Sequence, residues 1–192
     1  MFPPKSPVSI ALWNDSNAAG LPERLVVACR DTYAIVILDR ATGEVLQLLE
    51  LRDSTGRILG EPGDLLVDQT TNRAFVSCQA SDAVAEIDLT APGVVRVFKI
   101  PSKNPLFMSF DANKDVLVAP LLSGNNSGPR GTPNDPINIM HQGPTVVDFA
   151  AAGLNGTKLK DEDLFRLVRA TGAVQPLTTG AGTIQFACGV NP

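Results

Sequence analysis

The chain has few of the residues from which catalytic and metal sites are usually built. Its 192 residues include a single histidine, His141. One histidine excludes a metal site made of several histidines and leaves a Ser/His/Asp triad with one weak candidate. The segment 111–115 begins like a calcium loop, but it continues without the glycine and glutamate that such a loop needs, so we expect a hairpin turn there. We predict no catalytic residue, no metal site and no cofactor.

Long apolar runs and basic clusters are also missing. No segment approaches the ~18 apolar residues of a membrane helix, so no membrane span is expected. The first twenty residues lack the uninterrupted apolar core of a signal peptide. A net charge of −4 without a basic cluster argues against a nucleic-acid surface. With 44% hydrophobic residues, the chain is too apolar to be disordered.

The chain does contain a near-repeat of short alternating strands. The segment Arg24-Leu-Val-Val-Ala-Cys29 returns as Arg73-Ala-Phe-Val-Ser-Cys78, and in both copies an aspartate, Asp39 or Asp88, follows the cysteine by ten residues. A second pair of landmarks, Pro62 with Pro105 and Asp68 with Asp111, repeats after 43 residues. Self-similarity at a period in the forties, built from strands, is typical of propeller blades.

The repeat therefore predicts an all-β fold, a partial β-propeller over residues 1–192 with about three four-stranded antiparallel blades. The blades are expected at about 7–51, 62–100 and 104–179, and a strand at 183–187 would begin another. Propellers typically have about four to eight blades. We therefore expect an incomplete ring that belongs to a longer chain. Its unfinished blade edges would expose apolar surface, so self-association is possible.

Turn chemistry in the repeat leads to further expectations. Asp39 and Asp88 end their strands, where a short carboxylate can accept hydrogen bonds from turn N–H groups. Gly43, Gly93 and Gly172 are expected at equivalent places in hairpins that need a positive φ.

The segment 157–169 has two interpretations. Its local pattern fits a helix, because Leu164, Leu167 and Val168 would share one face. Its register in the repeat instead fits the third strand of a blade, over residues 164–168. We favour the strand because the register also accounts for the turn that follows.

The three cysteines, Cys29, Cys78 and Cys188, are an odd number. Equivalent positions of neighbouring blades are usually farther apart than the 7 Å or so that a disulfide allows between Cα atoms. We expect small buried thiols, and the redox compartment stays open.

A long insertion at 123–160, rich in glycine, proline and asparagine, is the best sequence candidate for a binding surface. Loops of this length are uncommon unless they are functional or disordered, and binding sites concentrate on loops. The alternative is an inert or flexible segment. The candidate binding residues are its polar side chains, Asn125, Asn126, Asp135, Asn138 and His141. The partner could be a protein or a small molecule.

The strand around Cys29, the strand Phe-Val-Ser-Cys78 and the turn Ala-Thr-Gly43 resemble the YVTN-type β-propeller repeats of bacterial and archaeal exported proteins. The resemblance covers roughly residues 22–122 and 161–192, with cysteine where asparagine is common. It implies an exported, periplasmic or extracellular propeller. Such propellers are often joined to other domains such as c-type cytochromes, although this chain has no Cys-x-x-Cys-His haem site.

Two classes of function remain. The favoured one is a non-catalytic binding or scaffold module of an exported protein, with partner contacts through the 123–160 loop. The alternative is a fragment of a propeller-containing enzyme, lactonase-like or redox, whose active site lies outside this chain.

Overall fold

Three antiparallel four-stranded sheets make up the described part of the computed structural model, which covers residues 4–15, 22–101, 103–122 and 162–179. Blade one contains β1 (Pro7–Asn14), β2 (Glu23–Cys29), β3 (Ala34–Asp39) and β4 (Val45–Glu50). Blade two contains β5 (Pro62–Asp68), β6 (Arg73–Cys78), β7 (Ala83–Asp88) and β8 (Gly93–Lys99). Blade three contains β9 (Lys103–Phe110), β10 (Val116–Leu122), β11 (Glu162–Val168) and β12 (Ala173–Thr179).

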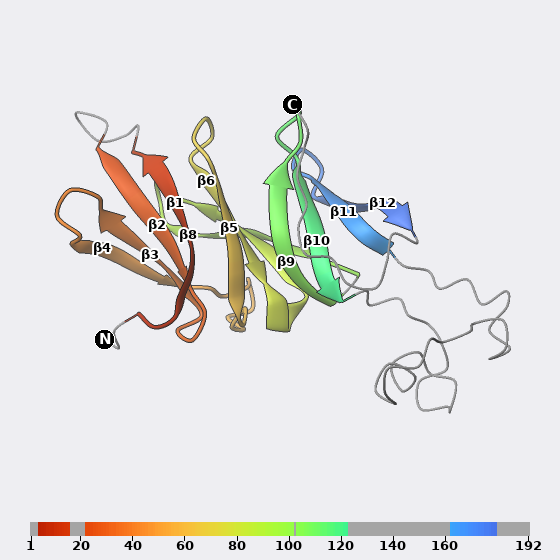
Figure 1. Cartoon of the computed structure of the whole chain (residues 1–192), viewed down its shortest axis with the longest axis horizontal. Helices are drawn as coiled ribbons and strands as arrows, with labels where there is room; N and C mark the ends of the chain where they lie inside the picture. The colour runs from red at the N-terminus through yellow and green to blue at the C-terminus, as the bar shows by residue number, and fades with distance from the viewer. Residues whose placement is uncertain (1–3, 16–21, 102, 123–161, 180–192) are drawn as a thin grey trace, which may run out of the picture.

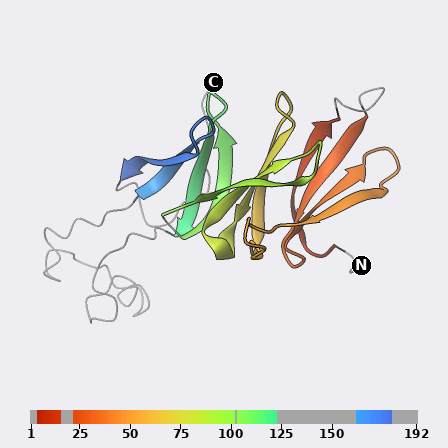
Figure 2. The ribbon, with the colours of Figure 1, turned by 180° about the vertical axis from the view of Figure 1, so that it is seen from behind.

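The three described blades follow one another side by side in chain order and by themselves do not close into a ring (Figure 1). Within each blade every strand pairs with its neighbours in the chain. The first strands β1, β5 and β9 contact one another in succession, so each blade begins at the same inner edge (Figures 1 and 2). Apart from one short 3-10 turn at Gln79–Ser81, the described residues contain no helix. The all-β fold predicted from the repeat is therefore confirmed.

Two hydrophobic cores lie between the blades rather than within them. The first joins blade one to blade two through residues such as Val26, Ile35 and Ile87, all fully buried. The second joins blade two to blade three and includes Phe75 and Phe165. Side chains along a β-strand point alternately to its two faces. In blade two, one face contributes to the first core and the other face to the second, so both alternating sets of residues are apolar.

The linker between blades one and two explains why the repeat has two spacings. β4 ends at Glu50 and β5 begins at Pro62, whereas β8 ends at Lys99 and β9 begins at Lys103. The extra residues form a small turn that the first core holds through two fully buried leucines, Leu51 and Leu59.

The strand interpretation of segment 164–168 is confirmed, because β11 pairs with both β10 and β12. Tertiary pairing outweighs the local helical pattern. The predicted turn role of the aspartates is also confirmed. Asp39 accepts hydrogen bonds from the backbone N–H groups of Ala41 and Thr42, each at 2.9 Å. Asp88 accepts the corresponding bonds from Thr90 and Ala91, at 2.9 and 3.1 Å.

The equivalence expected for the three turn glycines is wrong in one case. Gly43 and Gly172 have φ of +72° and +77°, as a left-handed turn position requires. Gly93 instead begins β8 and pairs with Asp88. The matching turn position in blade two is Pro92, whose ring fixes φ near −65° and therefore selects another turn.

The remaining expectations from the sequence can be compared with the structure only at the described residues. The turn at 111–115 is a hairpin turn in which the Asp111 carboxylate accepts N–H bonds from Asn113 and Asp115. Cys29 and Cys78 are unbridged and buried. The 123–160 loop, Cys188 and the strand expected at 183–187 lie outside the described residues. None of the described residues belongs to a helix long and apolar enough to cross a lipid bilayer.

Candidate functional site

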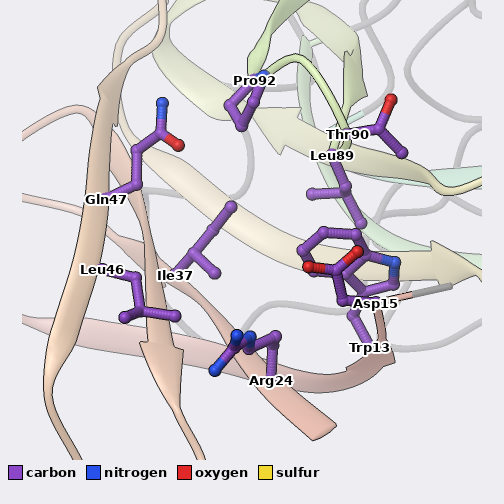
Figure 3. A pocket seen from close by; sticks show the side chains of 9 residues that line it. All are labelled: Trp13, Asp15, Arg24, Ile37, Leu46, Gln47, Leu89, Thr90 and Pro92. Carbon is purple, nitrogen blue, oxygen red and sulfur yellow. The ribbon is translucent and has the colours of Figure 1, made fainter. Parts of the chain in front are cut away.

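A hollow of about 260 Å³ opens between blade one and blade two, which we name the inter-blade hollow (Figure 3). Blade one supplies the ends of its strands and blade two supplies the turn between β7 and β8. Its lining residues are Trp13, Asp15, Arg24, Ile37, Leu46, Gln47, Leu89, Thr90 and Pro92. Apolar and polar groups thus share the lining, and the polar ones are a guanidinium, a carboxylate, an amide and a hydroxyl.

Hydrogen bonds hold the polar walls of the hollow in place. The indole Nε1 of Trp13 donates to the Asn72 side-chain oxygen at 2.9 Å and so links blade one to the β5–β6 turn of blade two. Arg24 lies opposite Asp39 in the β2–β3 register, and Arg24 Nη1 contacts the carboxylate at 2.5 Å. Hydrogen bonds from Thr42, above all its backbone N–H, hold the pKa of Asp39 below its ordinary value. The carboxylate therefore stays ionised and keeps Arg24 fixed.

The junction between blades two and three shows which residues stand at the positions equivalent to those that line the hollow. In blade one Ile37 lies opposite Gln47, and in blade two the equivalent pair is Glu86 and Arg96. Arg96 lies over the Phe98 ring, 5.5 Å from its centroid, and its Nη1 donates to the backbone oxygen of Arg169 at 2.6 Å. The longer side chain therefore crosses from blade two to blade three.

A second arginine fills the rest of the second junction. Arg169 follows β11 as Leu89 follows β7, so the two residues are equivalent. Arg169 Nη1 donates to Asp68 at 2.7 Å, and Nη2 donates to the Thr71 hydroxyl at 2.8 Å. Its guanidinium also lies 5.0 Å from the Phe75 ring centroid. Two arginines thus occupy the volume that Gln47 and Leu89 leave open at the first junction.

The second junction also contains a buried carboxylate, Asp68, which is 3% exposed. Burial alone would raise the pKa of Asp68, but hydrogen bonds from Thr70, Thr71 and Arg169 outweigh it and hold that pKa well below the ordinary 3.8. Charge is therefore neutralised internally at the second junction. The first junction has an apolar floor with hydrogen-bonding groups beside it, which suits an amphipathic ligand.

The structure does not test the residues that the sequence predicts to bind a partner. They are Asn125, Asn126, Asp135, Asn138 and His141, and all lie outside the described residues. Sequence reasoning missed the hollow. A comparison of the repeats position by position would have found it. Gln47 in blade one is equivalent to Arg96 in blade two, and Leu89 in blade two is equivalent to Arg169 in blade three. Among the described residues, no group of three or more histidine, cysteine, aspartate or glutamate side chains could hold a metal ion.

Comparison with known proteins identifies the fold. No family model matches the chain, and no curated protein sequence matches it either. Many solved structures are similar, and three of them are described here. Virginiamycin B lyase from Staphylococcus aureus has a TM-score of 0.52 at 10% identity, over 89% of this chain and 40% of that one. The WD40 β-propeller domain of Doa1 has a TM-score of 0.53 at 9% identity, over 85% and 39%.

The third structure, the hydrazine synthase of Kuenenia stuttgartiensis, has a TM-score of 0.51 at 17% identity, over 65% of this chain and 31% of that one. This chain thus spans well under half the length of each structure that it resembles. Identities this low show the fold alone, and that fold is the β-propeller.

Proposed function

We propose that this chain is a binding or scaffold module, part of an exported β-propeller of the YVTN-repeat type, that holds a partner without transforming it. The observation that carries the proposal is the inter-blade hollow. Equivalent positions of the next junction are filled by Arg96 and Arg169, so the hollow results from local replacement in the repeat and not from the way blades pack.

The lining of the hollow defines the class of ligand. Leu46, which is exposed, and Pro92 offer apolar contact, and Gln47, Arg24 and Thr90 offer hydrogen-bonding groups (Figure 3). A small amphipathic molecule, or a partner's side chain with an apolar body and a polar end, matches this arrangement. The 123–160 loop, with its asparagines and His141, is proposed as a second contact surface, and the periplasm or cell exterior as the location.

The carboxylates of the described blades support binding over the alternative of a propeller enzyme. Asp39 and Asp88 hold turns. Asp68 accepts from Arg169, and Arg166 bridges Asp111 and Asp115 at 3.1 and 2.8 Å. Each has a structural partner that fixes it. The alternative is a propeller enzyme, lactonase-like or redox, whose active site lies outside this chain.

Trp13 is the only tryptophan of the chain and lines the hollow, so its fluorescence reports what enters. The test is a fluorescence titration with a panel of small amphipathic compounds. Gln47→Arg should fill the hollow as Arg96 fills the next junction, and should weaken binding about tenfold or more, equivalent to about 1.4 kcal/mol. Val95→Arg is the matched control, because Val95 is exposed and does not line the hollow.

The loop is tested separately by deleting residues 125–156 and bridging the gap with a short glycine linker, which spares the blade strands. Loss of partner binding with unchanged folding supports the loop as a contact surface. If the loop deletion and Gln47→Arg both leave binding unchanged, the proposed binding function is wrong. Turnover of a bound compound would instead establish the enzyme alternative.

A further inference from the structure

The outer edge of β4, which we name the β4 edge, lies beside the inter-blade hollow. β4 is the last strand of its sheet, so among the described strands none pairs with this edge. Leu46 and Gln47 of β4 line the hollow. The side chains of Val45 and Leu46 are 46% and 45% exposed. An apolar edge strand with unpaired backbone groups is a template for another extended chain, so the edge and the hollow form one surface.

Hydrogen bonding between β3 and β4 determines which backbone groups face outward. The Leu51 N–H donates to the Tyr33 oxygen at 2.8 Å, a bond that flanks the pair formed by Glu50 and makes it a non-hydrogen-bonded pair. Such pairs alternate with hydrogen-bonded pairs along an antiparallel ladder. Leu48, two residues before Glu50 in an unbroken register, is therefore also in a non-hydrogen-bonded pair. Its N–H and C=O point away from β3, toward the position of an added strand.

A residue added opposite Gln47 would point toward the hollow. Ile37 and Gln47 lie opposite each other on β3 and β4, and both line the hollow (Figure 3). Side chains of residues directly opposite each other in a sheet project to the same face. The residue of an added strand that lies opposite Gln47 therefore extends this row, and Leu46 and Pro92 offer it apolar contact.

The outer edges of the other two blades carry features that discourage strand addition. β8 contains the charged residues Arg96 and Lys99, and β12 contains Pro176 at the position equivalent to Leu48. Charges and proline are common means of blocking an edge strand. Residues 45–49 of β4 include neither a charged residue nor a proline. All three strands have a register shift, so a bulge does not distinguish them, and the β4 edge is the least protected of the three.

We propose that the partner of the inter-blade hollow is an extended segment of another protein, which pairs with the β4 edge and places an apolar side chain in the hollow. This inference rests on the proposed function and names the kind of partner. Backbone hydrogen bonds at Leu48 supply affinity, and the side chain opposite Gln47 supplies specificity, as is usual when a peptide adds to a sheet edge. A small molecule in the hollow would leave these backbone groups unused.

Titration of the full chain with synthetic heptapeptides, followed by Trp13 fluorescence, tests the proposal. The probe has leucine at its centre, valine and threonine around it, and lysine at each end. Replacing the central leucine with glycine should weaken binding about tenfold or more, because the hollow loses its apolar occupant. N-methylation of the two residues beside the centre should weaken binding about fivefold or more, because their N–H groups can no longer donate to β4.

A variant of the protein tests the same hydrogen bonds from the other side. Leu48→Pro removes the outward N–H of β4 and should weaken binding of the leucine probe about fivefold or more. Val97→Pro is the matched control, because Val97 occupies the equivalent place on β8 and does not line the hollow. This variant should bind the probe as wild type does. Circular dichroism checks the fold of both variants, and the N-methylated probe tests the unchanged protein.

The outcomes separate this inference from the proposed function. If small amphipathic compounds bind and every peptide fails, this inference is wrong and the proposed function stands. If neither class binds, the proposed function is wrong as well. Peptide binding that N-methylation and Leu48→Pro both leave unchanged also contradicts the inference. Analytical ultracentrifugation of the chain alone provides the last check, since a dimer that Leu48→Pro dissociates would show that a second copy, and not another protein, occupies the β4 edge.

Discussion

Replacing Arg169 with leucine, the residue at the equivalent position of blade two, should loosen the junction between blades two and three. Arg169 is the cation that Asp68 faces, and Asp68 is only 3% exposed. A carboxylate so enclosed loses its hydration, and the guanidinium replaces part of what water supplied. Removing the guanidinium leaves Asp68 with the hydroxyl and backbone donors of its own turn.

The contacts of Arg169 set the size of the effect. Its bond to Asp68 is charge-assisted and contributes about 1.5–3 kcal/mol. Its position over the Phe75 ring adds about 0.5–1 kcal/mol. The leucine side chain of the variant stabilises the junction by about 1 kcal/mol through its own apolar contacts. The free energy of unfolding should therefore fall by about 1–3 kcal/mol.

Urea unfolding at neutral pH measures the loss, and Arg40→Leu is the matched control. Arg40 occupies the equivalent position in blade one and pairs with Glu23, but the two side chains are 50% and 47% exposed. A surface pair of this kind contributes at most about 1 kcal/mol. If Arg169→Leu costs no more than Arg40→Leu, the assignment of Arg169 as the principal tie between blades two and three is wrong.

The pH dependence of the same comparison tests the role of the carboxylate. The pKa of Asp68 is lower in the folded chain than the ordinary 3.8, so its stabilisation is complete above that value. It is lost as the pH falls toward the folded pKa, because the unfolded chain binds the proton first. Arg169 is one of the groups that lower this pKa, so Asp68 of the folded Arg169→Leu variant should bind a proton at a higher pH than Asp68 of folded wild type. The difference in stability between the two chains should therefore narrow from neutral pH to about pH 3. If the difference in stability stays constant with pH, Arg169 does not act through Asp68.

Two further predictions concern the turns and the thiols. Gly172→Ala should lower the free energy of unfolding by about 1 kcal/mol, because φ at Gly172 is +77°. Gly93→Ala, at the start of β8, should change that free energy by less than about 0.5 kcal/mol. The midpoints of urea unfolding compare the two variants. With Cys29 and Cys188 replaced by serine, Cys78 should react with a thiol reagent only as fast as the chain unfolds, because burial raises its pKa to about 12. Rapid reaction of the native chain would contradict this.

The blades could be predicted because strand alternation and turn chemistry repeat at a fixed spacing. The same register identified β11 although its local pattern also fits a helix, since a blade needs a partner for both β10 and β12. The error at Gly93 has an equally physical cause. A glycine that begins a strand and a glycine in a left-handed turn look alike in sequence, and only the fixed φ of Pro92 distinguishes them.

The hollow could not be predicted from any one blade, because it depends on how two neighbouring blades differ. Positions near the inner strands are apolar at both junctions and form the cores. Positions toward the outer strands lie where neighbouring blades diverge, and there the two junctions use opposite chemistry. One is filled by Arg96 and Arg169, while the other keeps Gln47 and Leu89 and stays open. The two junctions therefore pack their blades with different side chains at these positions, so a propeller repeat can acquire a binding site there without losing its fold.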